Sequence, residues 1–145
     1  AYKANPAALG AAREVLAEAE TIDDVGRIAR GRRIAIVGDM KELGPMQDQL
    51  HRALADLPAI EKIDVVHCVG PLMRNLHEAL APNMRGEWHE TATDMAGRIT
   101  HLLDAGDCVL VKGSLSTGLS AVVDGIRKMG HSARGAELGA HDKDI

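Results

Sequence analysis

Two short segments of the sequence hold the residues best suited to bind a polar ligand. Residues 38–44 read Gly-Asp-Met-Lys-Glu-Leu-Gly, and residues 112–118 read Lys-Gly-Ser-Leu-Ser-Thr-Gly. The second segment sets one lysine, two glycines and three hydroxyls before a predicted helix, so its amides, hydroxyls and ammonium group could hold a carboxylate or a phosphate. The candidate ligand-binding residues are Asp39 and Glu42 in the first segment and Lys112, Gly113, Ser114, Ser116 and Thr117 in the second.

Both segments also allow a purely structural interpretation. Asp39 and Glu42 could merely complement the positive end of the helix that follows them, and spacing alone favours that interpretation for the first segment. In the second segment, Ser116 or Thr117 could be an ordinary helix N-cap, with Lys112 a solvated strand end. Here the residue types leave the two interpretations evenly balanced.

Several other chemistries lack the residues that they need. No predicted strand is followed by Gly-x-Gly-x-x-Gly, and the 145 residues contain no Gly-x-x-x-x-Gly-Lys-Ser/Thr, so neither a dinucleotide fingerprint nor a P-loop is present. The seven histidines are scattered without paired ligand spacing, and we predict no metal site. Ser114 has no histidine and acid in a recognisable arrangement, so we predict no catalytic residue in this chain alone.

Composition and charge restrict the class of protein. The chain has 145 residues, of which 46% are apolar and 26% charged, as expected for one domain with a substantial core. Its 17 basic and 21 acidic residues give a net charge of −4, and its aromatic residues are Tyr2 and Trp88 alone. Neither a duplex nor a single strand of nucleic acid is therefore an expected partner.

The sequence also bears on compartment. No apolar run approaches the roughly 20 residues of a membrane-spanning helix, and the first residues do not form a basic and then apolar leader. We therefore expect a cytoplasmic protein without a membrane span. Cys68 and Cys108 lie within apolar runs and are expected to be buried, reduced thiols.

The hydrophobic pattern alternates between short buried strands and amphipathic helices. Strands are predicted at residues 33–38, 64–69 and 108–112, with a weaker, more polar one at 86–90 suited to a sheet edge. Helices are predicted from Asn5-Pro6 onward, from Gly44-Pro45 to Pro58, from Gly70-Pro71 to Pro82, from Thr91 or Thr93 to Gly106, and up to Gly130. The buried face of the helix after Gly44 is predicted to comprise Met46, Leu50, Leu54 and Leu57. Residues 21–31 are ambiguous, and residues 131–145 are predicted to be a flexible tail after a domain of residues 1–130.

Strands joined by helical crossovers must run parallel, because antiparallel neighbours need only a short turn. The sequence thus predicts an α/β fold, a doubly wound, mainly parallel sheet of four to six strands with helices on both faces. We expect the second and third strands on one side of the first strand and the fourth on its other side. That order brings residues 38–44 and 112–118 together at the carboxyl ends of neighbouring strands, where ligands bind in such sheets.

Three motifs, in this order, resemble the carboxyl-terminal domain of the Mur ligases. They are Tyr-Lys-Ala-Asn-Pro at residues 2–6, Gly-Asp-Met-Lys-Glu-Leu-Gly at 38–44 and Val-Leu-Val-Lys-Gly-Ser at 109–114. The resemblance covers residues 2–130 and is strongest to the members that add D-alanyl-D-alanine to UDP-N-acetylmuramoyl-tripeptide in peptidoglycan biosynthesis. It implies a Rossmann-like domain that closes onto a central ATPase domain.

The resemblance also implies a reaction and a place for each motif. In the complete bacterial enzyme, ATP with Mg²⁺ activates the tripeptide carboxyl as an acyl phosphate, which the dipeptide amine attacks with release of ADP and phosphate. The residues of 112–117, with Asp39 and Glu42, would lie on the dipeptide side, and Tyr2, Lys3 and Asn5 would form a hinge near the nucleotide. Lys3 stands where the family motif usually has asparagine. Because ATP and Mg²⁺ are held mainly by the central domain, we expect the 145 residues alone to be inactive and to bind no cofactor.

Two alternatives remain beside this interpretation. One is a stand-alone α/β ligand-binding or regulatory module similar to a receiver, which would need an acidic pair after the first strand and an acidic phosphoacceptor at the end of a central strand. Asp39 alone, and Val69-Gly70, do not supply these groups. The other is the equivalent domain of another Mur-type amide ligase, such as a folylpolyglutamate or cyanophycin synthetase. Residues 39–44 match the muropeptide enzymes best.

Overall fold

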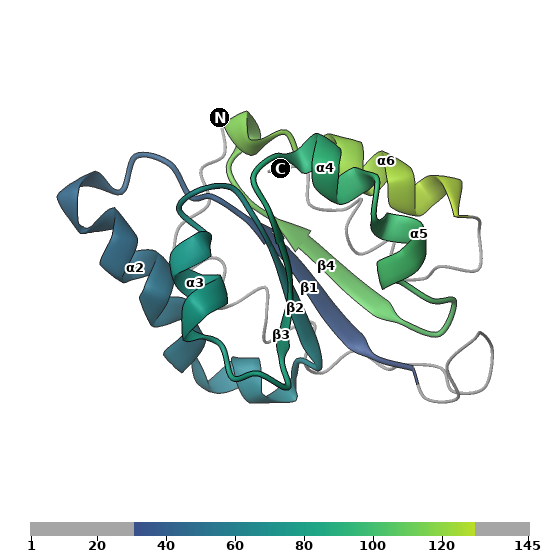
Figure 1. The fold of residues 1–145 in the computed structure, drawn as a ribbon, viewed down its shortest axis with the longest axis horizontal. Coiled ribbons are helices and arrows are strands. Elements are labelled where there is room, and N and C mark those ends of the chain that lie inside the picture. The colour runs from purple at the N-terminus through teal and green to yellow at the C-terminus, as the bar shows by residue number, and fades with distance from the viewer. Residues whose placement is uncertain (1–30, 130–145) are drawn as a thin grey trace.

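Four parallel strands form the centre of the structure, a computed structural model that describes residues 31–129 (Figure 1). They are β1 (Arg33–Gly38), β2 (Val65–Val69), β3 (Arg85–His89) and β4 (Cys108–Lys112). Their order is β3-β2-β1-β4, and every neighbouring pair is parallel. The predicted fold class, strand positions and strand order are therefore confirmed. The predicted first helix, most of the ambiguous segment, the tail and the hinge residues Tyr2, Lys3 and Asn5 lie outside the described residues.

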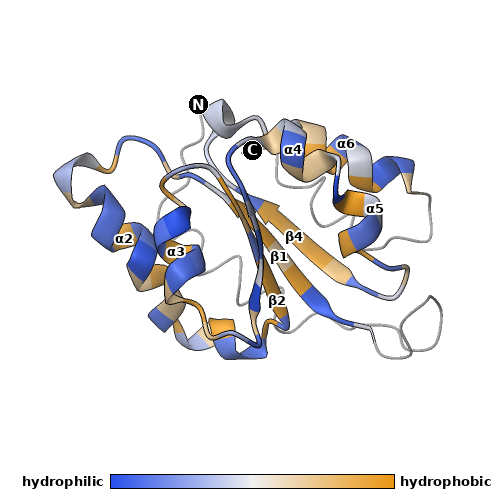
Figure 2. Ribbon diagram, viewed as in Figure 1, coloured by the Kyte–Doolittle hydropathy of each residue, from blue (hydrophilic) through white to orange (hydrophobic). Residues whose placement is uncertain are grey.

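Helices cover both faces of this sheet. α2 (Gln47–Ala53) and α3 (Arg74–Ala79) lie on one face, and α4 (Ala92–Ala96), α5 (Ile99–Leu102) and α6 (Ser120–Lys128) lie on the other (Figure 1). Within β1, Ala35 and Val37 join the apolar cluster under α2 and α3, while Ile34 and Ile36 join the cluster under α4 to α6. Because both faces are covered, the strand is apolar at successive positions, as Figure 2 shows for the sheet between the helical layers.

The helix after Gly44 differs from its predicted form. It begins with a 3₁₀ turn (η1, Gly44–Met46), and two further 3₁₀ segments follow α2, η2 (Leu54–Asp56) and η3 (Pro58–Lys62). Met46 is 53% exposed, so its predicted burial is wrong. A 3₁₀ turn has three residues per turn, which rotates Met46 off the face that α-helical spacing assigns to it. Leu54 is buried as predicted, Leu50 and Leu57 are partly buried, and His51 is a further buried residue of α2.

The predicted helix between Thr91 and Gly106 is also divided. The hydroxyl of Thr91 accepts from the amide of Asp94 at 3.2 Å, which confirms Thr91 as the N-cap of α4. The helix is interrupted at Gly97 and Arg98, between α4 and α5, and α5 ends at Leu102. The guanidinium of Arg98 binds both carboxylate oxygens of Glu87 in β3, at 3.0 and 2.9 Å, and this tertiary pair was not visible in the helical pattern.

The structure also bears on the two cysteines and on membrane-spanning helices. Cys68 and Cys108 are buried thiols, as predicted. Among residues 31–129, no helix is long and apolar enough to cross a membrane.

Candidate functional site

The two segments singled out in the sequence lie side by side in the structure. β1 and β4 are neighbours, and Val37 stands opposite Lys112, so residues 38–44 and 112–118 leave the sheet at the same level. The hydroxyl of Ser114 accepts from the backbone amide of Lys41 at 2.9 Å, and the amide of Ser114 donates to the carbonyl of Asp39 at 3.1 Å. The hydroxyl of Thr117 donates to the same carbonyl at 3.0 Å. We call these two segments the paired loops.

Two glycines allow the paired loops to approach this closely. A Cβ atom on Gly113 would lie 2.7 Å from the side chain of Leu119 and 3.1 Å from the Cα of Gly38. A Cβ atom on Gly38 would lie 2.7 Å from the methyl group of Thr117. A side chain at either position would therefore push the paired loops apart.

Asp39 ties the paired loops to a third element. Its buried carboxylate accepts from the amides of Met73 at 2.7 Å and Leu72 at 3.2 Å, in the turn that leads into α3, and Lys41 Nζ lies 3.6 Å from Oδ2. The structural interpretation that assigned Asp39 to the helix directly after it is wrong, because the carboxylate binds at the start of α3. Gly70, with φ +106°, leaves room for this carboxylate, since a Cβ atom there would come within 2.6 Å of all three carboxyl atoms.

His51 is a member of the site that the sequence did not reveal. The imidazole is completely buried, its Nε2 accepts from the amide of Met40 at 3.0 Å, and its Nδ1 lies 2.6 Å from the carbonyl of Gln47. This bonding requires the neutral ring with its proton on Nδ1. Side chains from α2 and from residues 112–118 thus hold two successive amides, those of Met40 and Lys41. The helical phase that buries Leu54 three residues later was the available signal for His51.

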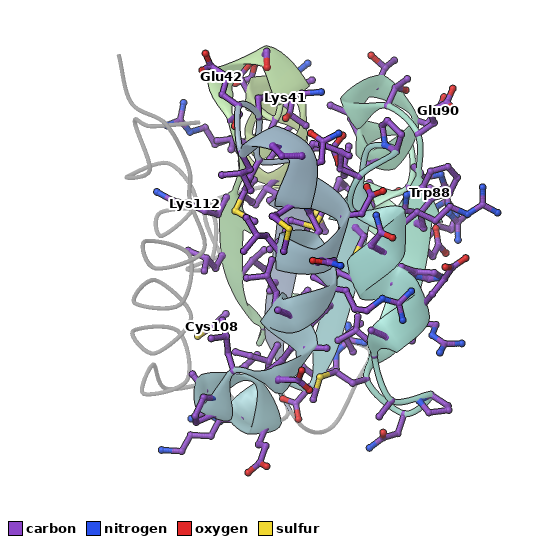
Figure 3. All side chains as sticks on the ribbon, turned by 90° about the vertical axis from the view of Figure 1, so that its left-hand side faces the viewer. Lys41, Glu42, Trp88, Glu90, Cys108 and Lys112 are labelled. Carbon is purple, nitrogen blue, oxygen red and sulfur yellow. The ribbon has the colours of Figure 1, made fainter. Side chains whose placement is uncertain are left out.

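The predicted residues divide into buried and exposed ones. Lys112 and Ser114 are each 6% exposed, and Gly113 between them is also buried. Ser116 and Glu42 are exposed, and the side chain of Lys41, which was not among the predicted residues, is 43% exposed. Figure 3 shows Lys41 and Glu42 together at one end of the sheet, with Lys112 on the β4 side.

These positions overturn the structural interpretation of the second segment. Lys112 is not a solvated strand end, because it is buried. Neither Ser116 nor Thr117 caps α6, whose N-cap residue is Leu119 without a side-chain bond. Glu42 adopts φ +62°, a left-handed conformation that is costly for a residue with a side chain.

The hydrogen bonds within the paired loops determine which side chains retain a donor for a ligand. A serine hydroxyl has one donor and two acceptor positions, and Ser114 uses an acceptor position, so its proton can still bind an anion. The hydroxyl of Thr117 already donates its proton to the backbone carbonyl of Asp39. The carboxylate of Asp39 already accepts from two amides. The hydroxyls of Ser114 and of the exposed Ser116 are therefore suited to donate to a ligand carboxylate, and the two lysines add positive charge nearby, while Asp39, Thr117 and His51 hold the loops.

The resemblance implies that the complete enzyme binds Mg²⁺ and ATP. Within residues 31–129, no three His, Cys, Asp or Glu side chains are grouped so that they could hold a metal ion such as Mg²⁺. The P-loop that would hold the phosphates of ATP is absent from the 145 residues.

Comparison with known proteins gives a consistent result. Residues 1–115 match the family described as Mur ligase, glutamate ligase domain. The UDP-N-acetylmuramoyl-tripeptide–D-alanyl-D-alanine ligase of Rickettsia prowazekii is 24% identical over 123 residues, which cover 85% of this chain and 25% of that protein. The chain thus spans about a quarter of the length of this relative.

Solved structures share the fold. MurF ligase from Thermotoga maritima, in complex with ADP, superposes with a TM-score of 0.65 at 22% identity, over 94% of this chain and 27% of that one. MurF from Acinetobacter baumannii superposes with a TM-score of 0.63 at 24% identity, over 85% and 26%. Because the family match covers most of its length and includes the first of the paired loops, this chain belongs to the Mur ligase family through the glutamate ligase domain.

Proposed function

We propose that this chain is the carboxyl-terminal lobe of an ATP-dependent ligase that adds D-alanyl-D-alanine to UDP-N-acetylmuramoyl-tripeptide in the bacterial cytoplasm. Family membership and the names of the relatives support the ligase over a regulatory module. The observation that carries the proposal is the bond between the hydroxyl of Ser114 and the amide of Lys41, because it joins two motifs through residues 73 positions apart in the sequence. These motifs are also the ones that resemble the ligases.

In this proposal the paired loops hold the dipeptide by its carboxylate. The partly exposed Lys41 and the buried Lys112 supply positive charge, and the hydroxyls of Ser114 and Ser116 donate to the carboxylate oxygens. Charge-assisted hydrogen bonds of this kind are shorter and stronger than neutral ones. Glu42, which is exposed, can accept from the amino end of the dipeptide.

The lobe would contribute orientation rather than bond-making groups. A bound carboxylate fixes one end of the dipeptide, so that closure of the lobe brings the amine to an activated tripeptide carboxyl held by the rest of the enzyme. Positioning of this kind can supply a large part of the acceleration of a two-substrate reaction. The hinge role of Tyr2, Lys3 and Asn5 and the domain limit at residue 130 remain predictions.

The experiment is a ligation assay of the complete ligase that contains this chain. The enzyme is supplied with ATP, Mg²⁺ and UDP-N-acetylmuramoyl-tripeptide, and ADP release is measured with D-alanyl-D-alanine or with glutamate as the amine. We expect ADP release and a pentapeptide product with the dipeptide alone. Turnover with glutamate instead would assign the chain to another Mur-type ligase, and no turnover with either amine would contradict the proposal.

A further inference from the structure

A pocket of about 640 Å³ lies on the opposite edge of the sheet from Lys112. Its walls are Arg74, His77 and Glu78 of α3 and the whole of the edge strand β3, Arg85–His89. Two strands, β2 and β1, separate β3 from β4, and Figure 3 shows Trp88 and Lys112 on opposite sides of the molecule. This edge pocket is therefore distinct from the paired loops. Its volume is within the range of small-molecule sites.

Each acidic group of the edge pocket has an arginine beside it. Glu87 binds the guanidinium of Arg98 through both oxygens, and His89 Nε2 lies 2.8 Å from one of them. The bond from Arg98 is the main cause that lowers the pKa of Glu87 to about 2. Glu78 lies 3.7 Å from Nε of Arg74, so each side chain offsets part of the charge of the other. Both carboxylates thus have an arginine beside them.

The basic groups keep most of their hydrogen-bonding capacity. Among the described residues, the guanidinium of Arg74 makes no hydrogen bond, and Arg85 uses only Nη2, which donates to the carbonyls of Leu80 and Glu78 at 2.9 and 3.2 Å. Among the lining residues, Arg74 and Arg85 balance Glu78 and Glu87, and Arg98, which does not line the pocket, pairs with Glu87. The unused guanidinium donors of Arg74 and Arg85 therefore favour an anionic ligand.

Trp88 gives the edge pocket a fixed wall. The indole Nε1 donates to the carbonyl of Gly70 at 2.7 Å, which sets the plane of the ring. Arg74 lies over that ring, 5.0 Å from its centroid, at cation–π distance. A stacked guanidinium keeps the donors in its own plane available for an oxyanion.

We infer that the edge pocket binds a phosphate-bearing small molecule, with the phosphate between the side chains of Arg74 and Arg85. A phosphate monoester carries about −1.5 to −2 charges at pH 7 and three acceptor oxygens, which suits two arginines with unused donors better than a single carboxylate does. The pocket is larger than a phosphate ion, so it has room for an organic part beside Trp88. This inference does not depend on the function proposed for the paired loops.

Fluorescence of the 145-residue chain tests the inference directly, because Trp88 is its single tryptophan. In a phosphate-free buffer, the chain is titrated with adenosine monophosphate, inorganic phosphate and adenosine. We expect a saturable change with adenosine monophosphate and at least about tenfold weaker binding of adenosine. Inorganic phosphate that binds as well as the nucleotide would identify free phosphate as the ligand, and tighter binding of the nucleotide would identify an ester.

Matched variants make the result specific to the edge pocket. Arg74→Gln and Arg85→Gln should each weaken binding by about tenfold or more, whereas Arg127→Gln, an exposed change of the same charge on α6, should leave it within about twofold. Shifts of the Trp88 indole and Gly86 amide resonances provide a second measurement and show that each variant is folded. No saturable change in either signal up to about 10 mM ligand, or equal binding by all three variants, would overturn the inference.

Discussion

Gly70 lacks a side chain, and the carboxylate of Asp39 that holds the paired loops fits into the space this leaves. The carboxylate of Asp39 occupies the space beside the Cα of Gly70 and binds two amides before α3. At φ +106°, the backbone of Gly70 is also in a region that other residues rarely adopt. Both constraints act on the same position.

We expect Gly70→Ala to lower the free energy of unfolding by roughly 2–4 kcal/mol, because the new Cβ would collide with Asp39. Gly44→Ala is the matched control, since Gly44 has φ +78° and open space around it, and should cost only about 1–2 kcal/mol. Urea denaturation of the two variants measures the difference. Equal losses would show that contact with Asp39 contributes nothing.

At the level of residues, the sequence predicted which groups gather but not how they are used. Asp39, Ser114 and Thr117 do meet at the paired loops, because a strand order read from hydrophobic runs was sufficient to bring them together. Their hydrogen bonds depend on backbone positions within the loops, which residue types do not specify. Lys41 was missed for the same reason, whereas His51 was missed although the helical phase of α2 places it near the buried Leu54.

At the level of elements, the strands were predictable and the helix limits were not. A strand buried on both faces is a continuous apolar run, and β1 and β4 have the limits that this pattern gives. Helix ends depend on tertiary contacts instead. The pair of Arg98 and Glu87 forms where α4 and α5 separate, and the 3₁₀ turn at Pro45 displaces Met46.

A buried histidine between β2 and β3 makes the free energy of unfolding depend on pH. His67, on β2, is buried, and its Nδ1 accepts from the amide of Glu87 at 2.9 Å. Burial is the main cause that lowers the pKa of His67 from 6.5 to about 4. Between these two values the unfolded chain binds more protons than the folded chain, so stability falls as the pH falls through that interval.

We expect the free energy of unfolding to decrease by roughly 3 kcal/mol between pH 6.5 and 4, as the shift of His67 implies. His67→Gln keeps an acceptor for the amide of Glu87 without titrating and should remove most of this decrease. Denaturation at several pH values measures both slopes. An unchanged slope in His67→Gln would assign the pH dependence to other groups, such as His77, whose pKa is also lowered by burial.

At the level of the whole molecule, the chain has the length of one lobe. It covers about a quarter of its ligase relatives, and its 145 residues contain no P-loop. We therefore expect the gene to encode Gly-x-x-x-x-Gly-Lys-Ser/Thr upstream of Ala1, because the proposed ligation requires bound ATP. Sequencing the locus checks this expectation, and a start codon directly before Ala1 would contradict it.

The most direct test of the paired loops is the KM of the complete ligase for each substrate, measured for Ser114→Ala and Lys112→Met. Both changes remove a group from the proposed carboxylate site, and Lys128→Met, at an exposed position of α6, is the control. We predict that the KM for D-alanyl-D-alanine rises roughly tenfold to a hundredfold in both variants, with unchanged KM values for ATP and the tripeptide. Unchanged dipeptide KM values in two folded variants would contradict the assignment of these loops to the dipeptide.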